Sequence, residues 1–289
     1  MKNSAKGKLL FSIDLEDVRD QINNGHHYKE RVPENTYRYL EFLQRHNSRA
    51  TFFVVGKTAR TYPGLISEIA SEGHEIACHS DSHIQLNKQT RDSFSGDILH
   101  NLDSLYNAGA IQVIGYRAPT FSLTEKSRWA YAILAEAGIK YSSSVLPARN
   151  PLYGWPEFGA EPRIIDDVLE IPISLHPSPL PHLPVTGGVY FRAFPFFLIK
   201  HSVKKYINSK RPILTYLHPY DIDVEQEHFM HPDIDDKRHL NWLMYFNRSS
   251  VLPKLERLVS MCDFQAYEDY YNASKLFPTL SIGKPNIQL

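Results

Sequence analysis

Short apolar segments alternate with longer amphipathic ones over the first half of the chain, and this alternation limits the folds available to it. Segments of helical spacing separate segments with the length and apolar composition of buried strands. The strand-like segments are 8–14 (KLLFSID), 50–56, 74–80, 111–117 and 140–144, and the helix-like segments are 33–46, 62–73, 90–109 and 122–138. Strands that alternate with helices in this way predict a parallel sheet with helical crossovers, either open or closed into a barrel.

The second half is less regular. Residues 145–193 are rich in Pro, Gly and aromatic residues, which indicates loops with short strands. A helix is expected at 194–210, an apolar strand at 212–219 and a last helix at 250–262. Because no repeat and no shift in composition divides the sequence, we expect one domain over residues 1–289. Its core would span about 8–225, with a C-terminal helical extension over 226–289.

Composition excludes some classes of partner. With 32 basic and 32 acidic residues the chain has no net charge, so no overall field attracts nucleic acid or an anionic membrane. Two cysteines, Cys78 and Cys262, are too few for a disulfide framework. The N-terminal sequence contains only the short apolar run LLF and no signal-peptide core. We therefore expect a cytoplasmic protein without a membrane-spanning segment.

Polar residues gather where the predicted strands end. The carboxyl ends of parallel strands meet at one rim of the sheet or barrel, which is where α/β proteins place their sites. This rim would carry acids, imidazoles and a guanidinium, a combination typical of metal-dependent hydrolases. They are Asp14, Glu16 and Asp17 after the first strand, His79 and His83 after the third, Arg117 after the fourth and His218 after the late strand.

His79 and His83 lie four positions apart, a spacing that lets two imidazoles bind one Zn²⁺. A carboxylate would be the third protein ligand and leave one position for water, as in catalytic zinc sites. The motif differs from HExxH, because Asp81 is the second residue after His79. Among 14 histidines the spacing also arises by chance, in which case the pair would be two polar turn residues.

Four motifs in the same order resemble those of the polysaccharide deacetylases with a NodB-like domain, carbohydrate esterase family 4. They are SIDLED, HSDSH, GYRAPTF and TYLHP, within roughly residues 8–225. The segments TFFVVG, GHEIACHS, LEIPIS and GGVYFR resemble the subgroup that acts in exopolysaccharide and surface-glycan biosynthesis. The resemblance implies a distorted (β/α)7-type barrel that hydrolyses the N-acetyl groups of amino sugars.

The resemblance also implies a role for each motif residue. His79, His83 and Glu16 would hold one divalent metal ion, which we expect to be Zn²⁺, with Co²⁺ or Ni²⁺ as alternatives. Asp14 would be the general base, and Arg117 would orient it and keep it ionised.

Other residues would act on the leaving group and the substrate. His218 would protonate the departing amine, and a backbone N–H near Thr120 would stabilise the oxyanion. Pro119 and Thr120, together with Tyr153 and Trp155 of NPLYGWPEF, would contact the sugar. The substrate would be an amino-sugar glycan or a lipid-linked or nucleotide-linked precursor.

Three positions depart from the family pattern. Asp17 is an alternative metal ligand, although two residues along a strand return to the same face and so favour Glu16 beside Asp14. Thr120 stands where an aromatic residue is usual, with Phe121 next to it. Ser143 stands where the family has an acid that tunes the histidine, so His218 would titrate lower unless Asp221 replaces that acid.

Other functions remain open. The same fold hosts hydrolases of small cyclic amides and ureides, and a carbohydrate-binding protein with an inactive site is a third reading. Residues 194–207 carry aromatic and basic side chains that suit weak contact with a membrane surface. The alternative for this segment is a helix that packs on the barrel.

Overall fold

The computed structural model describes residues 6–150, 153–177, 183–232, 234 and 236–276. The end of the predicted C-terminal extension, 277–289, and parts of the predicted loops at 151–152 and 178–182 lie outside the described residues. The domain boundaries stay a prediction.

The described strands form two sheets that share one continuous stretch of chain. Seven strands pair in the order β2-β3-β4-β5-β6-β8-β7, and three pair in the order β10-β1-β9. All of these pairings are parallel except that of β7 with β8. The strands are β1 (Gly7–Leu10), β2 (Ser12–Leu15), β3 (Thr51–Val54), β4 (Glu75–Cys78), β5 (Gly115–Tyr116), β6 (Tyr141–Ser142), β7 (Arg163–Ile165), β8 (Val168–Glu170), β9 (Ile213–Leu214) and β10 (Cys262–Gln265).

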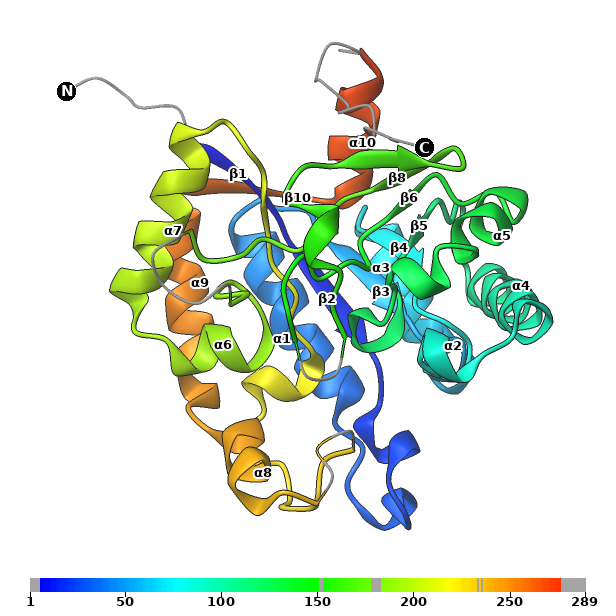
Figure 1. Cartoon of the computed structure of the whole chain (residues 1–289). Helices are drawn as coiled ribbons and strands as arrows, with labels where there is room; N and C mark the ends of the chain where they lie inside the picture. Colours follow the sequence, from blue (N-terminus) through cyan, green and yellow to red (C-terminus); the bar gives the residue numbers. More distant parts are fainter. Residues whose placement is uncertain (1–5, 151–152, 178–182, 233, 235, 277–289) are drawn as a thin grey trace.

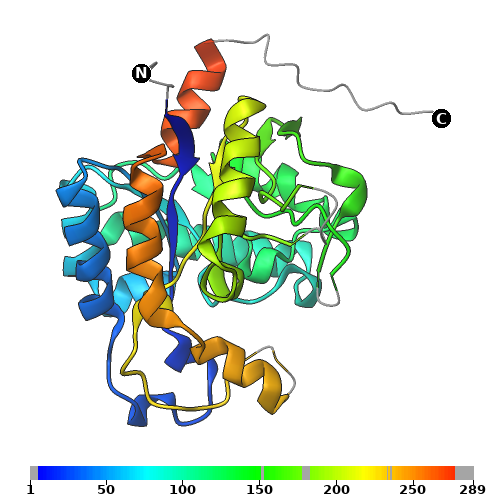
Figure 2. The ribbon, with the colours of Figure 1, turned by 90° about the vertical axis from the view of Figure 1, so that its left-hand side faces the viewer.

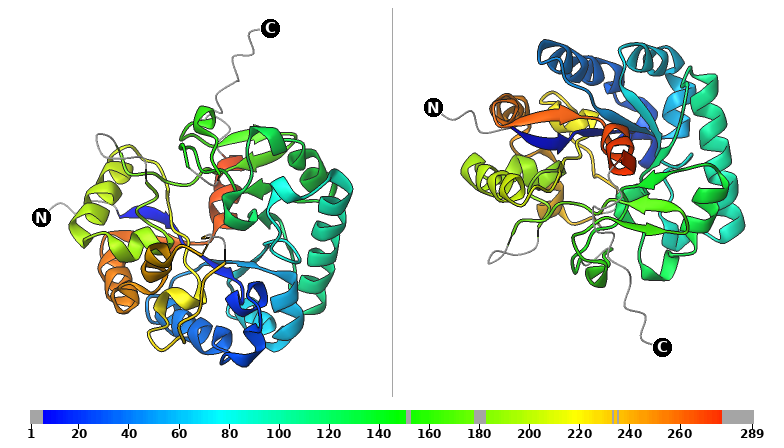
Figure 3. Two further views of the ribbon diagram at one scale, coloured as in Figure 1. Left: turned by 60° about the horizontal axis from the view of Figure 1, so that its bottom comes forward. Right: turned by 90° about the horizontal axis from the view of Figure 1, so that it is seen from above.

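The two sheets join because the first predicted strand changes partners halfway. β1 pairs with β9 and β10, whereas β2, which follows after Phe11, pairs with β3. The strands thus curve around an axis in the order β9, β1 with β2, β3, β4, β5, β6 and β8, and no described strand pairing joins β8 to β9. Seen along this axis, the strands lie inside and the helices outside (Figure 3). The predicted distorted barrel is confirmed.

Helices cover the outside of the barrel and both of its ends. α9 lies between α1 and α7 on one side (Figures 1 and 2), while α10 and α8 lie at opposite ends of the molecule (Figure 1). The helices are α1 (Val32–Arg45), α2 (Gly56–Thr61), α3 (Pro63–Ser71), α4 (Arg91–Asn107), α5 (Ala130–Glu136), α6 (Gly188–Ala193), α7 (Phe196–Asn208), α8 (Arg238–Tyr245), α9 (Val251–Val259) and α10 (Tyr267–Leu276).

The C-terminal region is less helical than the sequence predicted. The expected helix over 250–262 ends earlier, and Cys262–Gln265 forms β10, which pairs with β1 over its full length. Phe264 of this strand packs against Phe11, with ring centroids 5.2 Å apart. The segment CDFQ alternates apolar and polar residues as a strand does, but four residues directly after a helical pattern are too short to predict a strand, and the buried tertiary contact accounts for it.

One face of α7 packs on the barrel and the other faces solvent. Phe196 is 8% exposed, and the guanidinium of Arg257 from α9 lies 3.7 Å from its ring centroid. Phe197 is 68% exposed.

Within the described residues, no helix has the length and apolar character needed to cross a membrane.

The two neighbouring phenylalanines provide a matched test of this packing. We expect Phe196→Ala to lower the free energy of unfolding by about 3 kcal/mol, because it empties a buried ring site. Phe197→Ala should change it by less than about 0.5 kcal/mol. Urea denaturation of both variants checks the prediction, and equal losses of stability would contradict the orientation of α7.

Candidate active site

Two acids enter the site from the end of β2. Asp14 and Glu16 are 3% and 6% exposed, and both line a cavity of about 280 Å³. They share a face because side chains two residues apart along an extended chain point the same way. Asp17 points elsewhere: it caps the 3-10 helix Val18–Gln21 and forms an ion pair with Arg19, with Oδ2 and Nη2 2.5 Å apart.

Two histidines arrive from the end of β4. His79 directly follows the strand, and its Nδ1 lies 2.8 Å from the carbonyl oxygen of Arg117. A carbonyl oxygen only accepts, so Nδ1 carries the proton and Nε2 is left as the basic nitrogen. His83 has a left-handed backbone (φ 54°) that turns its ring toward the acids, and its Nε2 lies 2.8 Å from Glu16 Oε2.

Glu16, His79 and His83 each offer one ligand atom, and these atoms lie within 4.8 Å of one another. This set fits a divalent metal ion: two imidazoles and one carboxylate are ligands that Zn²⁺ accepts, and the three side chains leave room for water. The carbonyl that fixes the His79 ring is the kind of outer partner that orients metal-bound histidines.

Charges within the site favour deprotonated ligands. Burial would raise the pKa of Glu16, but the imidazoles of His83, His218 and His79 hold it well below its usual value. Burial lowers the pKa of His79 to about 4, despite the opposing charge of Asp14. Both groups are therefore in the form that a metal ion requires at neutral pH.

Arg117 fixes the position of Asp14 from inside the barrel. Its side chain is fully buried, and Nη1 lies 2.5 Å from Asp14 Oδ1. The same guanidinium donates to Ser12 Oγ at 2.8 Å and to the Tyr267 hydroxyl at 2.9 Å. It also donates to the carbonyl and hydroxyl oxygens of Ser143, at 3.2 and 3.4 Å. With all five N–H groups partnered, Arg117 holds Asp14 in one orientation.

His218 stands on the opposite side of Asp14 and has its own acid. Its Nε2 lies 4.0 Å from Asp14 Oδ2 and 3.8 Å from Glu16 Oε1. Its Nδ1 lies 2.9 Å from Asp221 Oδ2, and Asp221 in turn lies 2.9 Å from Nε of the buried Arg192.

The electrostatics of this group keep His218 protonated. Burial acts against the charge, but the hydrogen bond and the charge of Asp221 raise the pKa of His218 to about 8. Burial likewise opposes the charge of Asp221, yet Arg192 and His218 lower its pKa to about 2. Asp221 thus supplies the carboxylate beside His218 that the family pattern places at the position of Ser143. Ser143 itself contacts Arg117.

The cavity continues on both sides of the acids and histidines. Besides the site residues, Thr120 and aromatic side chains line the larger cavity: Phe121, Tyr190, Tyr216 and Tyr220. A second cavity of about 250 Å³ shares Glu16, Gln21 and His83 with the first, and the rest of its lining is mostly polar and includes Asp20 and Lys57. The candidate metal ligands therefore lie between two hollows.

Some predicted residues do not reach this place. Among the described residues that line the 280 Å³ cavity, Asp17, Pro119, Tyr153 and Trp155 are absent. Asp17 is held by Arg19, Pro119 is buried, and the Trp155 ring packs edge-on against Phe158 at 5.2 Å. An aromatic-rich loop predicts exposed rings but not the direction in which they point, and here the ring completes a local cluster.

Other contributors were missed. Arg192 and Tyr267 touch the acids or Arg117, and the Tyr220 ring stacks on His218 with centroids 4.6 Å apart. Arg192 is the last residue of GGVYFR, a segment quoted above only for its resemblance, and Tyr267 lies in the predicted extension, so neither stands at the end of a predicted strand. Only Tyr220 carried a signal, because it stands two residues after His218 at a strand end.

Comparison with known proteins agrees with this geometry. A family model described as Polysaccharide deacetylase matches residues 22–142, and a model described as Domain of unknown function (DUF3473) matches residues 143–272. The chain therefore contains a polysaccharide deacetylase domain, which covers less than half of it, and a DUF3473 region follows that domain.

Individual relatives match shorter stretches. A peptidoglycan-N-acetylglucosamine deacetylase of Bacillus cereus is 33% identical over 98 residues, which are 34% of this chain and 36% of that protein. The matched part thus spans about a third of that relative's length.

Two solved structures share the whole fold. One is described as a polysaccharide deacetylase from Mycobacterium smegmatis; it has a TM-score of 0.67 at 16% identity, over 99% of this chain and 97% of that one. Puue allantoinase has a TM-score of 0.63 at 14% identity, over 97% and 94% of the two chains. At these identities the likeness concerns the fold alone.

The neighbouring acids Glu16 and Asp17 give a matched test of the metal site. We expect Glu16→Gln to weaken Zn²⁺ binding by more than about a hundredfold, since even outer partners of metal ligands contribute about 10–100-fold. Asp17→Asn should bind Zn²⁺ within about threefold of the unaltered protein, because its carboxylate faces Arg19. Isothermal titration calorimetry measures both, and the reverse order would assign the ligand to Asp17.

The Asp221 contact predicts how activity depends on pH. A histidine with a pKa of about 8 is protonated below that pH, so a reaction that needs its proton slows as pH rises through about 8. Asp221→Asn removes the charge that raises the pKa, so this alkaline limb should move to lower pH by roughly one unit or more. The measurement is a pH profile of kcat/KM.

Asp223→Asn is the control for this experiment, because Asp223 is also buried but pairs with Arg31. Its alkaline limb should stay in place. A limb that is unmoved in Asp221→Asn, in a protein whose thermal unfolding remains cooperative, would remove Asp221 from the control of His218.

Proposed function

We propose that this chain removes N-acetyl groups from the amino sugars of a glycan or glycan precursor, with one divalent metal ion as cofactor. One observation carries the proposal: Asp14, Glu16, His79, His83 and His218 converge on a single cavity. They come from three strand ends far apart in the sequence, and together they supply a metal ligand set, a base and an acid. Metal-assisted hydrolysis of an amide uses all three.

Glu16, His79 and His83 are the residues that would hold the ion, and we expect Zn²⁺ before Co²⁺ or Ni²⁺. When bound, a divalent ion supplies Lewis-acid polarisation of the acetyl carbonyl and acidifies bound water. The protein's own groups then have to move two protons, one away from the water and one to the amine.

Asp14 is the base in this proposal. Its Oδ1 is occupied by Arg117, while Oδ2 faces His218 and the cavity. Only Oδ2 is therefore available to accept a proton from the attacking water. Arg117 is a positioning residue: buried behind Asp14, it fixes the carboxylate and touches no substrate.

His218 is the acid. The charge of Asp221 keeps its ring protonated near neutral pH, and its Nε2 faces the space between Asp14 and Glu16. A proton donated from this nitrogen would reach the amine as the carbon–nitrogen bond breaks. Thr120, whose backbone is left-handed (φ 53°) at the cavity wall, is the position from which we expect a backbone N–H to reach the oxyanion.

The hollows on both sides of Glu16 and His83 favour an extended substrate over a small cyclic amide. A sugar chain can place one unit at the acid and base and continue into the neighbouring cavity, whereas a small ring fills only one. Aromatic walls at Phe121, Tyr190 and Tyr216 offer apolar faces to a sugar ring. We therefore replace Tyr153 and Trp155 by these residues as the expected sugar contacts.

Acetate release is the direct test. Purified protein loaded with Zn²⁺ should release acetate from N-acetylated oligosaccharides, with kcat/KM rising from the monosaccharide to short oligomers. Hydrolysis of a cyclic ureide at a higher kcat/KM would favour the second reading, which shares this fold. Tight binding of the oligosaccharides without any release of acetate would favour an inactive binding protein.

The carrier and the compartment stay predictions. Assays with nucleotide-linked and lipid-linked N-acetyl sugars distinguish the two kinds of precursor. If the membrane surface takes part, Phe197→Ser should reduce activity on the lipid-linked sugar alone, because Phe197 is the exposed aromatic residue of α7. Cell fractionation tests the expected cytoplasmic location.

The role of Asp14 gives a prediction of its own. Asp14→Asn should retain Zn²⁺ and lower kcat by about 10²–10⁴-fold, the usual contribution of a general base. Zinc content and single-turnover rates are the measurements, with Asp17→Asn as the control that keeps its activity. Unchanged turnover in Asp14→Asn would remove this residue from the mechanism.

A further inference from the structure

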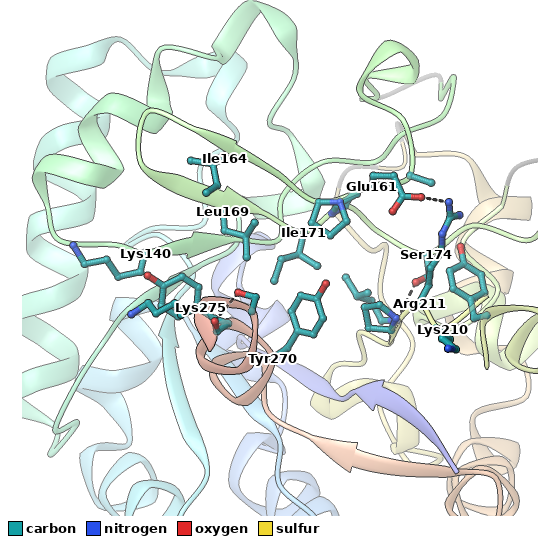
Figure 4. A pocket seen from close by; sticks show the side chains of 18 of the residues that line it. Lys140, Glu161, Ile164, Leu169, Ile171, Ser174, Lys210, Arg211, Tyr270 and Lys275 are labelled. Carbon is teal, nitrogen blue, oxygen red and sulfur yellow. Dashed lines mark hydrogen bonds and ion pairs between the residues drawn. The ribbon is translucent and has the colours of Figure 1, made fainter. Parts of the chain in front are cut away.

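A third hollow lies at the end of the barrel opposite to the candidate active site. This cleft has a volume of about 320 Å³, at the low end of the range for small-molecule sites. Its walls come from residues at or near the start of β6 and β9, from β7 and β8, and from α10 (Figure 4). It corresponds to the place where β8 and β9 do not pair.

The interior of the cleft is apolar and recessed. Leu169, Ile171 and Leu214 form part of it and are 6%, 1% and 2% exposed. Ile164 is 51% exposed, and Figure 4 shows it beside Leu169, with Tyr270 of α10 across from Ile171. These side chains offer dispersion and burial to an apolar group and few hydrogen-bonding groups.

The mouth of the cleft is cationic. Lys140, Lys210, Arg211 and Lys275 stand against Glu161 and Asp167, which gives four positive and two negative side chains and a net charge of +2. Lys140 and Lys275 lie at one end of the cleft and Lys210 and Arg211 at the other (Figure 4).

The two ends differ in how far their charges are already compensated. Arg211 forms an ion pair with Glu161. Within the part of the chain that the structure describes, no ion pair involves Lys140, Lys210 or Lys275, although the Lys275 amine lies 4.3 Å from the Tyr271 ring centroid. The end with Lys140 and Lys275 therefore has two cations outside ion pairs and the other end has one, so the first end has the greater capacity for an anion.

We propose that this cleft binds a single-chain anionic amphiphile, such as a long-chain alkyl phosphate. The anionic head would contact Lys140 and Lys275, and the alkyl chain would lie along Ile164, Leu169 and Ile171 toward Leu214. This arrangement pairs the uncompensated cations with charge and covers the apolar wall in one molecule.

A bilayer surface is a poorer fit than a single molecule. A flat membrane contacts side chains that protrude, whereas Leu169, Ile171 and Leu214 line the cleft below its rim and are reached only by a group that enters it. A glycan is also a poorer fit to this apolar part of the wall, because these side chains offer no hydrogen bonds; the hydroxyl groups of the cleft belong to other residues of the lining, such as Ser174, Ser274 and Tyr270. The site is thus distinct from the substrate cavity in both position and chemistry.

The probe for this proposal is dodecyl phosphate, titrated into the full-length protein by calorimetry below its critical micelle concentration. We expect saturable binding, with affinity at least about tenfold higher than for octyl phosphate, because each buried methylene group adds to binding. Dodecyltrimethylammonium, which has the same chain and the opposite charge, should bind at least about tenfold more weakly.

Variants locate the binding. The double variant Lys140→Glu, Lys275→Glu should weaken dodecyl phosphate at least about tenfold, and Ile164→Ser should weaken it less. Lys204→Ala, an exposed lysine of α7 outside the cleft, is the control and should bind as the unaltered protein does. Thermal unfolding verifies that each variant is folded.

Several outcomes would overturn the proposal. These are an unaltered affinity in the double lysine variant, equal affinity for the ammonium amphiphile, and no dependence on chain length. Binding to anionic vesicles without binding of the monomeric probe would assign the cleft to a membrane surface. Concentration-dependent dimerisation that Ile164→Ser abolishes would assign it to a second copy of the chain.

Discussion

The ion pair between Arg117 and Asp14 is the interaction on which the rest of the site depends. A fully buried guanidinium is costly unless every donor finds a partner, and here all five N–H groups do. These partners come from β2, the segment after β6 and α10, while Arg117 itself follows β5. One side chain therefore ties together four parts of the barrel. Removing it would leave Asp14 buried without its counterion, so the contact that orients the proposed base also stabilises the fold.

Arg192 plays the corresponding part for His218. It is fully buried and compensates Asp221, which in turn holds the His218 ring and keeps it charged. The proposed base and the proposed acid are thus each supported by a buried arginine, but in opposite ways. Arg117 contacts the base directly and stabilises its negative charge. Arg192 does not contact the proposed acid directly. It stabilises the negative charge of Asp221, and that charge in turn stabilises the positive charge of His218.

The site is shared between the two matched parts of the chain. Residues 22–142 contribute both histidines of the candidate metal site and Arg117, whereas residues 143–272 contribute His218, Asp221, Arg192 and Tyr267. Asp14 and Glu16 precede both. Because the acid and its partners come from the DUF3473 region, that region is part of the proposed catalytic machinery and more than a cover for the barrel. Asp221, whose carboxylate contacts His218, also comes from this region. It lies three residues after His218, in the 3-10 helix Pro219–Ile222.

The sequence predicted the parts of this arrangement that depend on strand order and strand period. Strand ends converge in any parallel barrel, so Asp14, His79, Arg117 and His218 could be placed together from their positions in the sequence, and the two-residue period of a strand favoured Glu16 over Asp17. Ring directions in the loop with Tyr153 and Trp155, the strand at Cys262–Gln265 and the reach of Tyr267 depend on contacts between distant segments, which no local pattern encodes.

Fold alone also leaves the substrate open, since an allantoinase shares this barrel. The choice between a sugar chain and a small cyclic amide then depends on the side chains that line the cavity. Glu16 and His83 line both the 280 Å³ cavity and the neighbouring 250 Å³ cavity. A substrate can therefore extend from one cavity into the other, which fits the proposed chain of sugars better than a single small ring.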